Sequence, residues 1–227
     1  MSKKKYNLLI VAHPDDETIF FGGLLQQKRN LPWHVFCATD GNADGHGQKR
    51  ARDFANACKA LKVKSFTHSD FPDAFEKRLD LVRLEQQFAQ LPAPAAVYTH
   101  GPLGEYGHAH HQDVGLATFR FFSKKVPTWG LAYNCYPDFK IQLTKTQFER
   151  KTKILSEIYG SETQRFQNIL PATSAEGFCR FTLQEVEALY RYYTQKKLPA
   201  KSELQKFKWL LSFFELHQER PMGPRLF

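Results

Sequence analysis

Residues 13–17, His-Pro-Asp-Asp-Glu, bring an imidazole and three carboxylates together directly after an apolar run. His13 and Asp16 are three residues apart, so together they can chelate one divalent cation through imidazole and carboxylate ligands. Asp15 is then left beside that cation and can move a proton. The alternative is an acidic helix N-terminus, in which Asp15 or Asp16 is the cap and Glu17 lies in the first turn.

A second group of potential ligands follows another short apolar run, at residues 95–100. The glycine-rich segment after this run ends in three histidines within four positions, His108, His110 and His111. His108 and His111 are spaced i and i+3, so they share one face if a helix has begun there. Two clusters of acids and histidines, each at the end of an expected strand, favour one shared metal site over packing or surface roles.

We expect one divalent ion to be bound by His13, Asp16 and His111. Zinc is the expected metal, and another divalent ion such as Fe²⁺ is the alternative. Three protein ligands leave positions for water and a substrate oxygen, and Asp15 would accept the water proton. His108 would either protonate the leaving amine or stabilise the oxyanion, and the sequence leaves both roles open. These residues therefore predict metal-assisted hydrolysis.

The chain around these clusters alternates expected strands with expected helices. Hydrophobic periodicity predicts strands at residues 6–12, 33–39, 63–67, 95–100 and 128–136, and helices at about 17–29, 48–61, 79–90 and 110–122. Repeated β-α units imply an α/β fold with a Rossmann-like, mostly parallel sheet flanked by helices. After residue 144 the pattern becomes helical, at about 145–159, 182–195 and 201–217. We therefore expect a single domain over residues 1–227 with a helical C-terminal flank at about 144–227.

Composition fits a globular enzyme with a sizeable core. The chain has 227 residues, a formal net charge of +9 and four cysteines, none in a CxxC pair. It contains no apolar run of eighteen residues and no signal-peptide pattern, so we expect a cytoplasmic location with reduced thiols. No nucleic-acid-binding motif accompanies the basic excess, which predicts a solvated basic surface and no nucleic-acid partner. A weak contact with an anionic membrane surface, through an amphipathic helix at 201–217, is the alternative.

Several motifs in this order resemble the LmbE-like family, which includes the N-acetylglucosaminyl-phosphatidylinositol de-N-acetylases and thiol-sugar deacetylases. The motifs, over about residues 6–180, are Ala12 to Glu17 with Gly22-Gly23, Thr39-Asp40-Gly41, Arg50 to Leu61, Gly107-His108 with His111, Tyr159-x-Ser161 and Glu176-x-Phe178. This chain departs from the family pattern in two places. Residues 108–111 read His-Ala-His-His where the family usually has His-Pro-Asp-His, and Asp53 replaces a usual glutamate. Neither departure removes a proposed metal ligand.

The resemblance implies removal of an N-acetyl group from a GlcNAc-type sugar or sugar conjugate, giving acetate and a free amine. It also implies that Tyr106 contacts the reaction intermediate and that Arg50 binds substrate. For the remaining loop histidines, His46 and His110, an exposed position without a role is an equal alternative to a place in the site. The alternative functions are an amidase acting on another amide conjugate and a non-catalytic sugar- or lipid-binding protein that retains the fold. Retention of Asp15 argues against a binding protein, which has no need for a base beside the metal.

Overall fold

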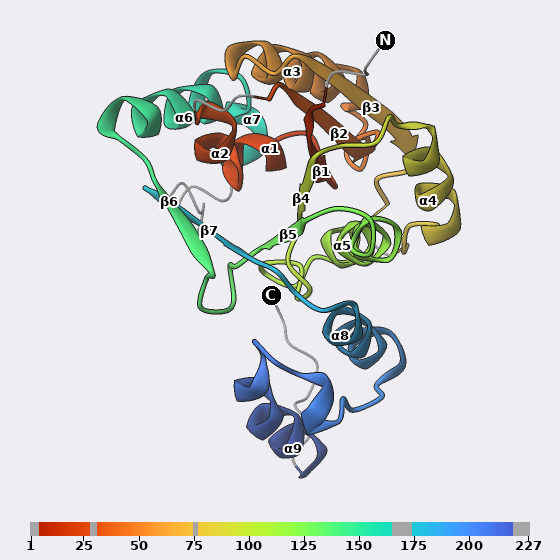
Figure 1. Cartoon of the computed structure of the whole chain (residues 1–227). Helices are drawn as coiled ribbons and strands as arrows, with labels where there is room; N and C mark the ends of the chain where they lie inside the picture. The colour runs from red at the N-terminus through yellow and green to blue at the C-terminus, as the bar shows by residue number, and fades with distance from the viewer. Residues whose placement is uncertain (1–4, 28–30, 75–76, 165–173, 220–227) are drawn as a thin grey trace.

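A computed structural model describes residues 5–27, 31–74, 77–164 and 174–219 of the chain. Its strands are β1 Asn7–Val11, β2 Trp33–Thr39, β3 Ser65–Phe71, β4 Ala96–Thr99, β5 Thr128–Leu131, β6 Phe139–Gln142 and β7 Ala175–Cys179. They form one seven-stranded sheet in the order β3-β2-β1-β4-β5-β7-β6 (Figure 1). The strands from β3 to β5 are parallel, and β7 pairs antiparallel with both β5 and β6. The expected mostly parallel sheet is confirmed.

The helices cover both faces of the sheet (Figure 1). Their bounds are α1 Asp16–Ile19, α2 Gly22–Gln26, α3 Gly47–Ala60, α4 Leu81–Gln90, α5 Ala109–Phe122, α6 Lys145–Glu157, α7 Gly160–Thr163, α8 Leu183–Gln195 and α9 Leu211–Glu219. Helices α1, α2, α3 and α6 lie on one side of β1, and α4 and α5 lie on the other. None of the described helices combines the length and hydrophobicity needed to cross a bilayer.

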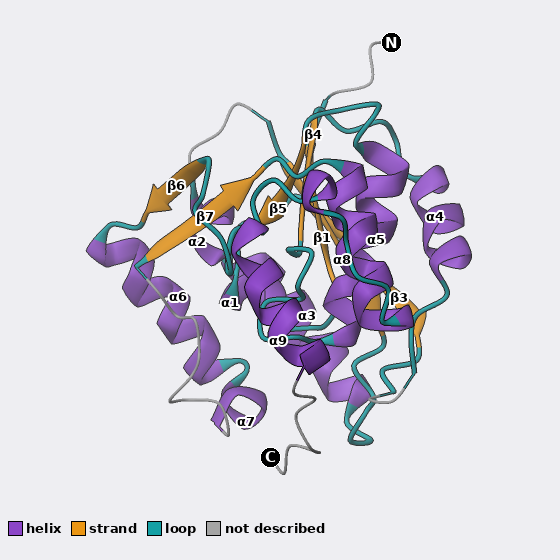
Figure 2. Cartoon of the chain, turned by 90° about the horizontal axis from the view of Figure 1, so that it is seen from below, coloured by secondary structure: helices purple, strands orange, loops and turns teal. Residues whose placement is uncertain are grey.

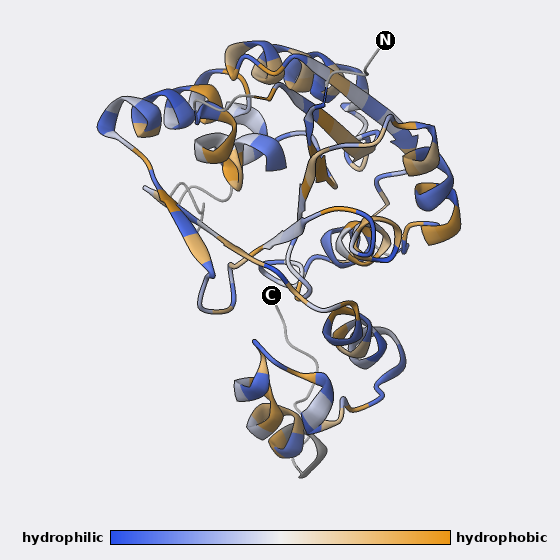
Figure 3. Ribbon diagram, in the orientation of Figure 1, coloured by the Kyte–Doolittle hydropathy of each residue, from blue (hydrophilic) through white to orange (hydrophobic). Residues whose placement is uncertain are grey.

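Strand β1 is hydrophobic on both sides because it is buried between the two helical layers. Leu9 and Val11 belong to the apolar cluster that includes α3 and α6, whereas Leu8 and Ile10 belong to the cluster formed with α4 and α5. All four side chains are fully buried. Figure 3 shows the same pattern, with hydrophobic residues along the central strands and mixed faces on the surrounding helices. The carboxyl end of β1 is thereby held at the centre of the molecule.

The C-terminal helices pack against α5 rather than against the sheet. A third apolar cluster joins α5, the end of β7, α8 and the segment leading into α9, and includes Phe119, Phe181, Leu189 and Phe207. Figure 2, seen from below, shows α8 beside α5, with α9 on the viewer's side of the sheet. The expected helix at 201–217 is divided into short 3₁₀ segments at Lys201–Glu203 and Lys208–Leu210, followed by α9.

The single helix expected at 17–29 is instead two short helices, because the helix is interrupted between α1 and α2. Residues 28–30 lie outside the described part. A Cβ atom on Gly23 would lie 2.4 Å from Cδ1 of Leu143, so only glycine permits this close approach. Glu176 of β7 accepts hydrogen bonds from the backbone N–H groups of Gly23 and Leu24, both at 2.7 Å, and thus caps α2. Glu176 also pairs with the buried Lys151 at 2.8 Å.

Two other expectations need correction. The strand expected at 128–136 ends at Leu131, because the chain turns away there before it forms β6. The segment after residue 144 is not purely helical, since β7 returns to the sheet and separates β5 from β6.

Candidate active site and metal centre

The carboxyl ends of β1 and β4 bring the two predicted ligand clusters together. These strands are parallel neighbours, so the chain leaves both at the same edge of the sheet. The backbone N–H of Ala12 donates to Nε2 of His100 at 3.0 Å, which ties the two strand ends to each other. Residues after Ala12 therefore face the start of α5, where His111 lies.

His13, Asp16 and His111 converge on one point. Nδ1 of His13 lies 3.3 Å from Nε2 of His111. The carboxylate of Asp16 lies 3.4 Å from each of these nitrogens, through Oδ2 to His13 and Oδ1 to His111. Tetrahedral zinc with bonds of about 2.0–2.1 Å requires ligand atoms roughly 3.3 Å apart. The two imidazole nitrogens and the carboxylate thus have the spacing and the chemistry for a zinc-type ion.

Glu105 fixes the direction of the His111 ring. Its Oε2 accepts from Nδ1 of His111, so that the Nε2 lone pair of His111 faces Asp16. Oε1 of Glu105 accepts from the backbone N–H of Gly101 at 2.8 Å. His100 stacks on His111 with ring centroids 3.9 Å apart and also bonds Glu105. Sequence reasoning missed Glu105 and His100, although both lie at the loop that carries the second cluster.

The electrostatics of the cluster favour a cation. Burial opposes protonation of His13, but the carboxylates of Asp16 and Asp73 outweigh it and raise the pKa of His13 to about 10. Burial also opposes ionisation of Asp16, yet the neighbouring imidazoles of His111 and His100 hold the pKa of Asp16 well below its usual range. Buried carboxylates that hold an extra proton on an imidazole would equally attract a metal ion.

Asp15 adopts a strained backbone conformation beside the ligand set. Its φ is 115°, a value that non-glycine residues rarely adopt and that is enriched at functional sites. Oδ2 of Asp15 lies 3.2 Å from a guanidinium nitrogen of Arg50. Burial and the charge of Asp16 raise the pKa of Asp15 well above its usual range, although Arg50 and His13 counteract this. A raised pKa makes Asp15 a stronger base.

Arg50, on α3, is largely buried and already engaged. Its guanidinium donates to the Pro14 carbonyl at 2.7 Å and lies 3.4 Å from Oδ2 of Asp73. Together with the Asp15 contact, this geometry describes a residue that orients the loop carrying Pro14 and Asp15. A direct contact between Arg50 and a sugar hydroxyl stays a prediction. Asp73, in the loop after β3, carries no sequence motif and was missed.

Glu17 lies in the first turn of α1 and is fully buried. Its carboxylate accepts from the Tyr159 hydroxyl at 3.0 Å and from the backbone N–H of Asp15 at 3.1 Å. Burial raises the pKa of Glu17 to about 7, although these hydrogen bonds favour the ionised form. Glu17, itself held by Tyr159, therefore supports the backbone of Asp15.

His108 is the N-cap residue of α5, and this role determines which of its ring nitrogens carries the proton. Its Nδ1 accepts from the backbone N–H of His110 at 3.2 Å, which places the ring proton on Nε2. Burial and the nearby imidazole of His13 lower the pKa of His108 to about 2. The ring lies 4.5 Å from that of His13 and 4.8 Å from that of His111. His108 is thus a neutral N–H donor beside the ligand set, which suits oxyanion stabilisation better than proton delivery.

Tyr106 stands at the mouth of the site. Its side chain is exposed, and its ring lies 5.5 Å from that of His111 and 5.9 Å from that of His108. The position is compatible with contact to a bound substrate. His46 is exposed, whereas His110 is buried, so the alternative of an exposed loop residue does not hold for His110.

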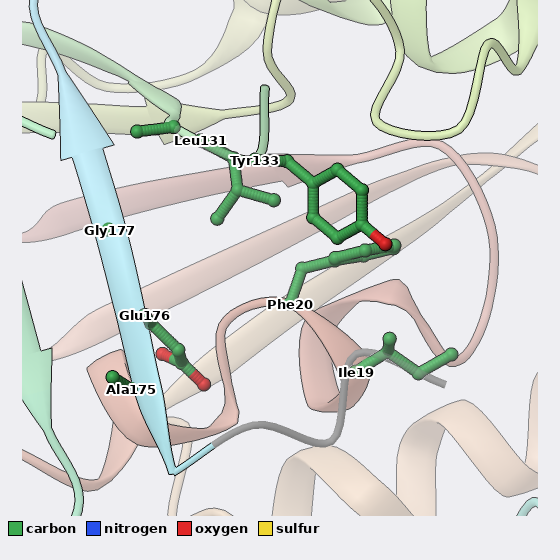
Figure 4. A pocket seen from close by; sticks show the side chains of 8 residues that line it. Ile19, Phe20, Leu131, Tyr133, Ala175, Glu176 and Gly177 are labelled. Atoms are coloured by element: carbon green, nitrogen blue, oxygen red, sulfur yellow. The ribbon is translucent and has the colours of Figure 1, made fainter. Parts of the chain in front are cut away.

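A cavity of about 230 Å³ adjoins the site on the side of β5 and β7 (Figure 4). Phe20 forms one wall, and its ring lies 5.8 Å from that of His111 and 6.1 Å from that of Tyr133. Leu131 and Glu176 line the cavity from β5 and β7. Phe20 thus lies between this cavity and His111 of the proposed ligand set.

Comparisons with known proteins identify relatives of the chain. Residues 8–122 match the family model described as PIG-L: GlcNAc-PI de-N-acetylase. The N-acetylglucosaminyl-phosphatidylinositol de-N-acetylase of Saccharomyces cerevisiae is 30% identical over 91 residues, which cover 36% of this chain and 30% of the yeast protein. An uncharacterised protein of Acanthamoeba polyphaga mimivirus is 27% identical over 174 residues, covering 69% of this chain and 76% of that protein.

Solved structures show the same fold. The N,N'-diacetylchitobiose deacetylase of Pyrococcus horikoshii superposes with a TM-score of 0.58 at 19% identity, covering 77% of this chain and 83% of the other. The family match covers both strand ends and the start of α5, where the two ligand clusters meet. The chain therefore belongs to the PIG-L, or LmbE-like, family of GlcNAc-PI de-N-acetylase-type proteins.

Proposed function

We propose that the chain is a zinc-type metal-dependent hydrolase that removes an N-acetyl group from a GlcNAc-type sugar or sugar conjugate. The products are acetate and the free amine. The observation that carries this proposal is the convergence of His13, Asp16 and His111 with spacings of 3.3–3.4 Å, beside the strained Asp15. The acetyl-sugar substrate rests on family membership and on the names of the yeast and Pyrococcus relatives.

A divalent ion held by His13, Asp16 and His111 would polarise the amide carbonyl and acidify a water molecule. Asp15 accepts the proton of the attacking water, whose oxygen forms the new bond to the carbonyl carbon. His108 donates its Nε2–H to the carbonyl oxygen as negative charge develops there. Protonated Asp15 then delivers its proton to the leaving nitrogen as the C–N bond breaks. One carboxylate thus serves first as base and then as acid.

The local hydrogen bonds favour an enzyme over a binding protein that merely retains the fold. Arg50, Glu17 and Asp73 converge on the loop that carries Asp15 and hold it in an unfavourable backbone conformation. Strain of this kind costs of order 1–3 kcal/mol, so it persists where a side chain must point in one direction. A site that only bound a sugar would not require a base with a raised pKa.

The test is a screen of the zinc-loaded protein against a panel of N-acetylglucosaminides, with detection of released primary amine. Release of one amine per acetate, abolished by a chelator and restored by zinc, supports the proposal. Cleavage of other amide conjugates alone would replace the sugar substrate by an amidase function. Binding of the panel without amine release would show a non-catalytic protein.

The other proposals concern partners and location. We propose an N-acetylated sugar as the partner of the site, a cytoplasmic location and no nucleic-acid partner. A weak contact with an anionic membrane surface is a separate proposal, supported by the basic net charge and the exposed Trp209 and Phe213. Co-sedimentation with anionic vesicles tests it.

A further inference from the structure

His110 lies on the opposite edge of the His13 ring from the proposed metal. Its side chain is buried, and its Nδ1 lies 3.1 Å from Nε2 of His13. The two rings are tilted by 33°, with centroids 5.3 Å apart. His13 is therefore held at both ring nitrogens, by Asp16 and His111 on the Nδ1 side and by His110 on the Nε2 side.

A backbone carbonyl decides which nitrogen of His110 carries the proton. Nε2 of His110 lies 2.8 Å from the carbonyl oxygen of Lys77. A carbonyl oxygen can only accept, so the proton of His110 is on Nε2 and its Nδ1 presents a lone pair. The His13–His110 bond then requires the proton of His13 to be on Nε2. This tautomer directs the Nδ1 lone pair of His13 at Asp16 and His111, where a metal ion needs it.

Asp73 does not replace His110 as the hydrogen-bond acceptor. Its Oδ1 lies 3.5 Å from Nε2 of His13 and 3.5 Å from Nδ1 of His110, longer than the bond between the two imidazoles. Its other oxygen faces Arg50. Asp73 thus adds negative charge near His13. The orientation of the His13 ring is set by the hydrogen bonds that run from His13 through His110 to the Lys77 carbonyl.

We propose that His110 is a positioning residue for the metal site, whose Nδ1 accepts from Nε2 of His13 and so leaves Nδ1 of His13 for the metal. The inference rests on the proposed metal ligands. The departure at residues 108–111 supports it, since the position that is usually aspartate in the family is occupied here by an imidazole with its own fixed tautomer. In this chain a histidine thus contacts and orients His13, a proposed metal ligand.

Two substitutions at position 110 isolate the acceptor. His110→Asn places a carbonyl oxygen near the former Nδ1 and can accept from His13, whereas His110→Leu has a similar size and accepts nothing. Both variants lose the bond to Lys77, so their difference reports the contact with His13. The dissociation constant for zinc is measured by chelator competition at one pH. We expect His110→Leu to weaken zinc binding by roughly 10–100-fold and His110→Asn to stay within about threefold of wild type.

A spectroscopic measurement on the unmodified zinc-loaded protein keeps the test decisive if a variant does not fold. Nitrogen NMR of labelled histidines should show His13, assigned through correlations to its own backbone, bound to zinc through Nδ1 with its proton on Nε2. Zinc bound to Nε2 of His13, or equal zinc affinities for His110→Asn and His110→Leu, would overturn the inference. A second bound zinc that disappears in His110→Leu would also overturn it, because His110 would then be a ligand. These readouts do not depend on deacetylation, so they separate this inference from the proposed activity.

Discussion

Oδ2 of Asp15 lies 3.2 Å from the guanidinium nitrogen of Arg50 that also donates to the carbonyl of Pro14. One cation thus holds both the side chain of Asp15, the residue assigned as base, and the backbone carbonyl of the residue before it. The contact explains how a carboxylate with a strained backbone and a raised pKa keeps its direction beside three further charged groups.

Replacing Arg50 by lysine should separate charge from positioning. Lysine keeps the positive charge, but it lacks the planar fork that contacts Pro14, Asp15 and Asp73 together. We expect metal content to remain and kcat to fall by roughly 10²-fold, the scale of a slightly misplaced catalytic group. Steady-state kinetics with metal analysis measure this. Arg52→Lys, an exposed position on the same helix, is the control and should behave like wild type.

Asp15→Asn tests the base directly. Asparagine preserves size and hydrogen bonding but cannot take a proton, so turnover should fall by about 10²–10⁴-fold while zinc stays bound. Because the pKa of Asp15 is raised and the base works only when ionised, wild-type kcat/KM should decline as pH falls through a value above the usual carboxylate range. Asp44→Asn, in an exposed loop, serves as control. Loss of zinc from Asp15→Asn would instead identify Asp15 as a ligand.

His108→Gln distinguishes oxyanion stabilisation from proton delivery. Since His108 is neutral and its Nδ1 is occupied by a backbone N–H, we expect it to act only as a donor. The variant should keep its metal, lose at most about 10³-fold in kcat and retain the alkaline limb of the pH–rate profile. If that limb disappears in His108→Gln, His108 is the general acid and the second role of Asp15 is wrong.

Metal binding should depend on all three ligands and should stabilise the fold. His111→Ala leaves two ligands and should abolish stoichiometric zinc binding, because a bidentate site has much lower affinity. Zinc should raise the melting temperature of the wild-type protein but not that of His111→Ala. His46→Ala removes an exposed histidine and should retain both effects. Full zinc occupancy in His111→Ala would refute the ligand set.

The buried pair of Lys151 and Glu176 predicts a large stability effect away from the site. Lys151→Met leaves the Glu176 carboxylate buried beside two backbone donors without its cation, and should lower the free energy of unfolding by about 3–5 kcal/mol. Urea unfolding measures the change. Lys145→Met removes one partner of an exposed pair with Glu149 and should cost about 0–1 kcal/mol. Similar costs for the two variants would contradict the structural role of the buried pair.

Much of the site could be predicted because its residues follow apolar strands directly. His13, Asp15 and Asp16 lie within a few residues of β1, so local spacing was enough to group them. Asp73 and Glu105 could not be found in this way. Glu105 contacts His111 from a loop in which Glu105 itself has a φ of 56°. Asp73 lies near His13 on the loop that follows β3, at the edge of the sheet.

The fold shows the same division between local and distant causes. Parallel strands up to β5 alternate with helices and have clear periodicity, whereas β7 is a five-residue strand containing Gly177. Its pairing partners, β5 and β6, precede it by more than thirty residues, so no local sequence pattern predicts that this segment is a strand. The break between α1 and α2 likewise depends on Leu143 and Glu176, which are distant in sequence.

The insertion of β7 between β5 and β6 determines the order in which the sheet can form during synthesis. When the ribosome has made residues 5–144, β1 to β5 can already pair, but β6 has no neighbour in the sheet. β6 is held only after Ala175–Cys179 has been translated, and the same strand brings the carboxylate that caps α2, close in sequence to Asp16. The proposed metal ligands are thus translated well before β7, the strand that joins β6 to the sheet. A protein shortened before residue 175 would lack this strand.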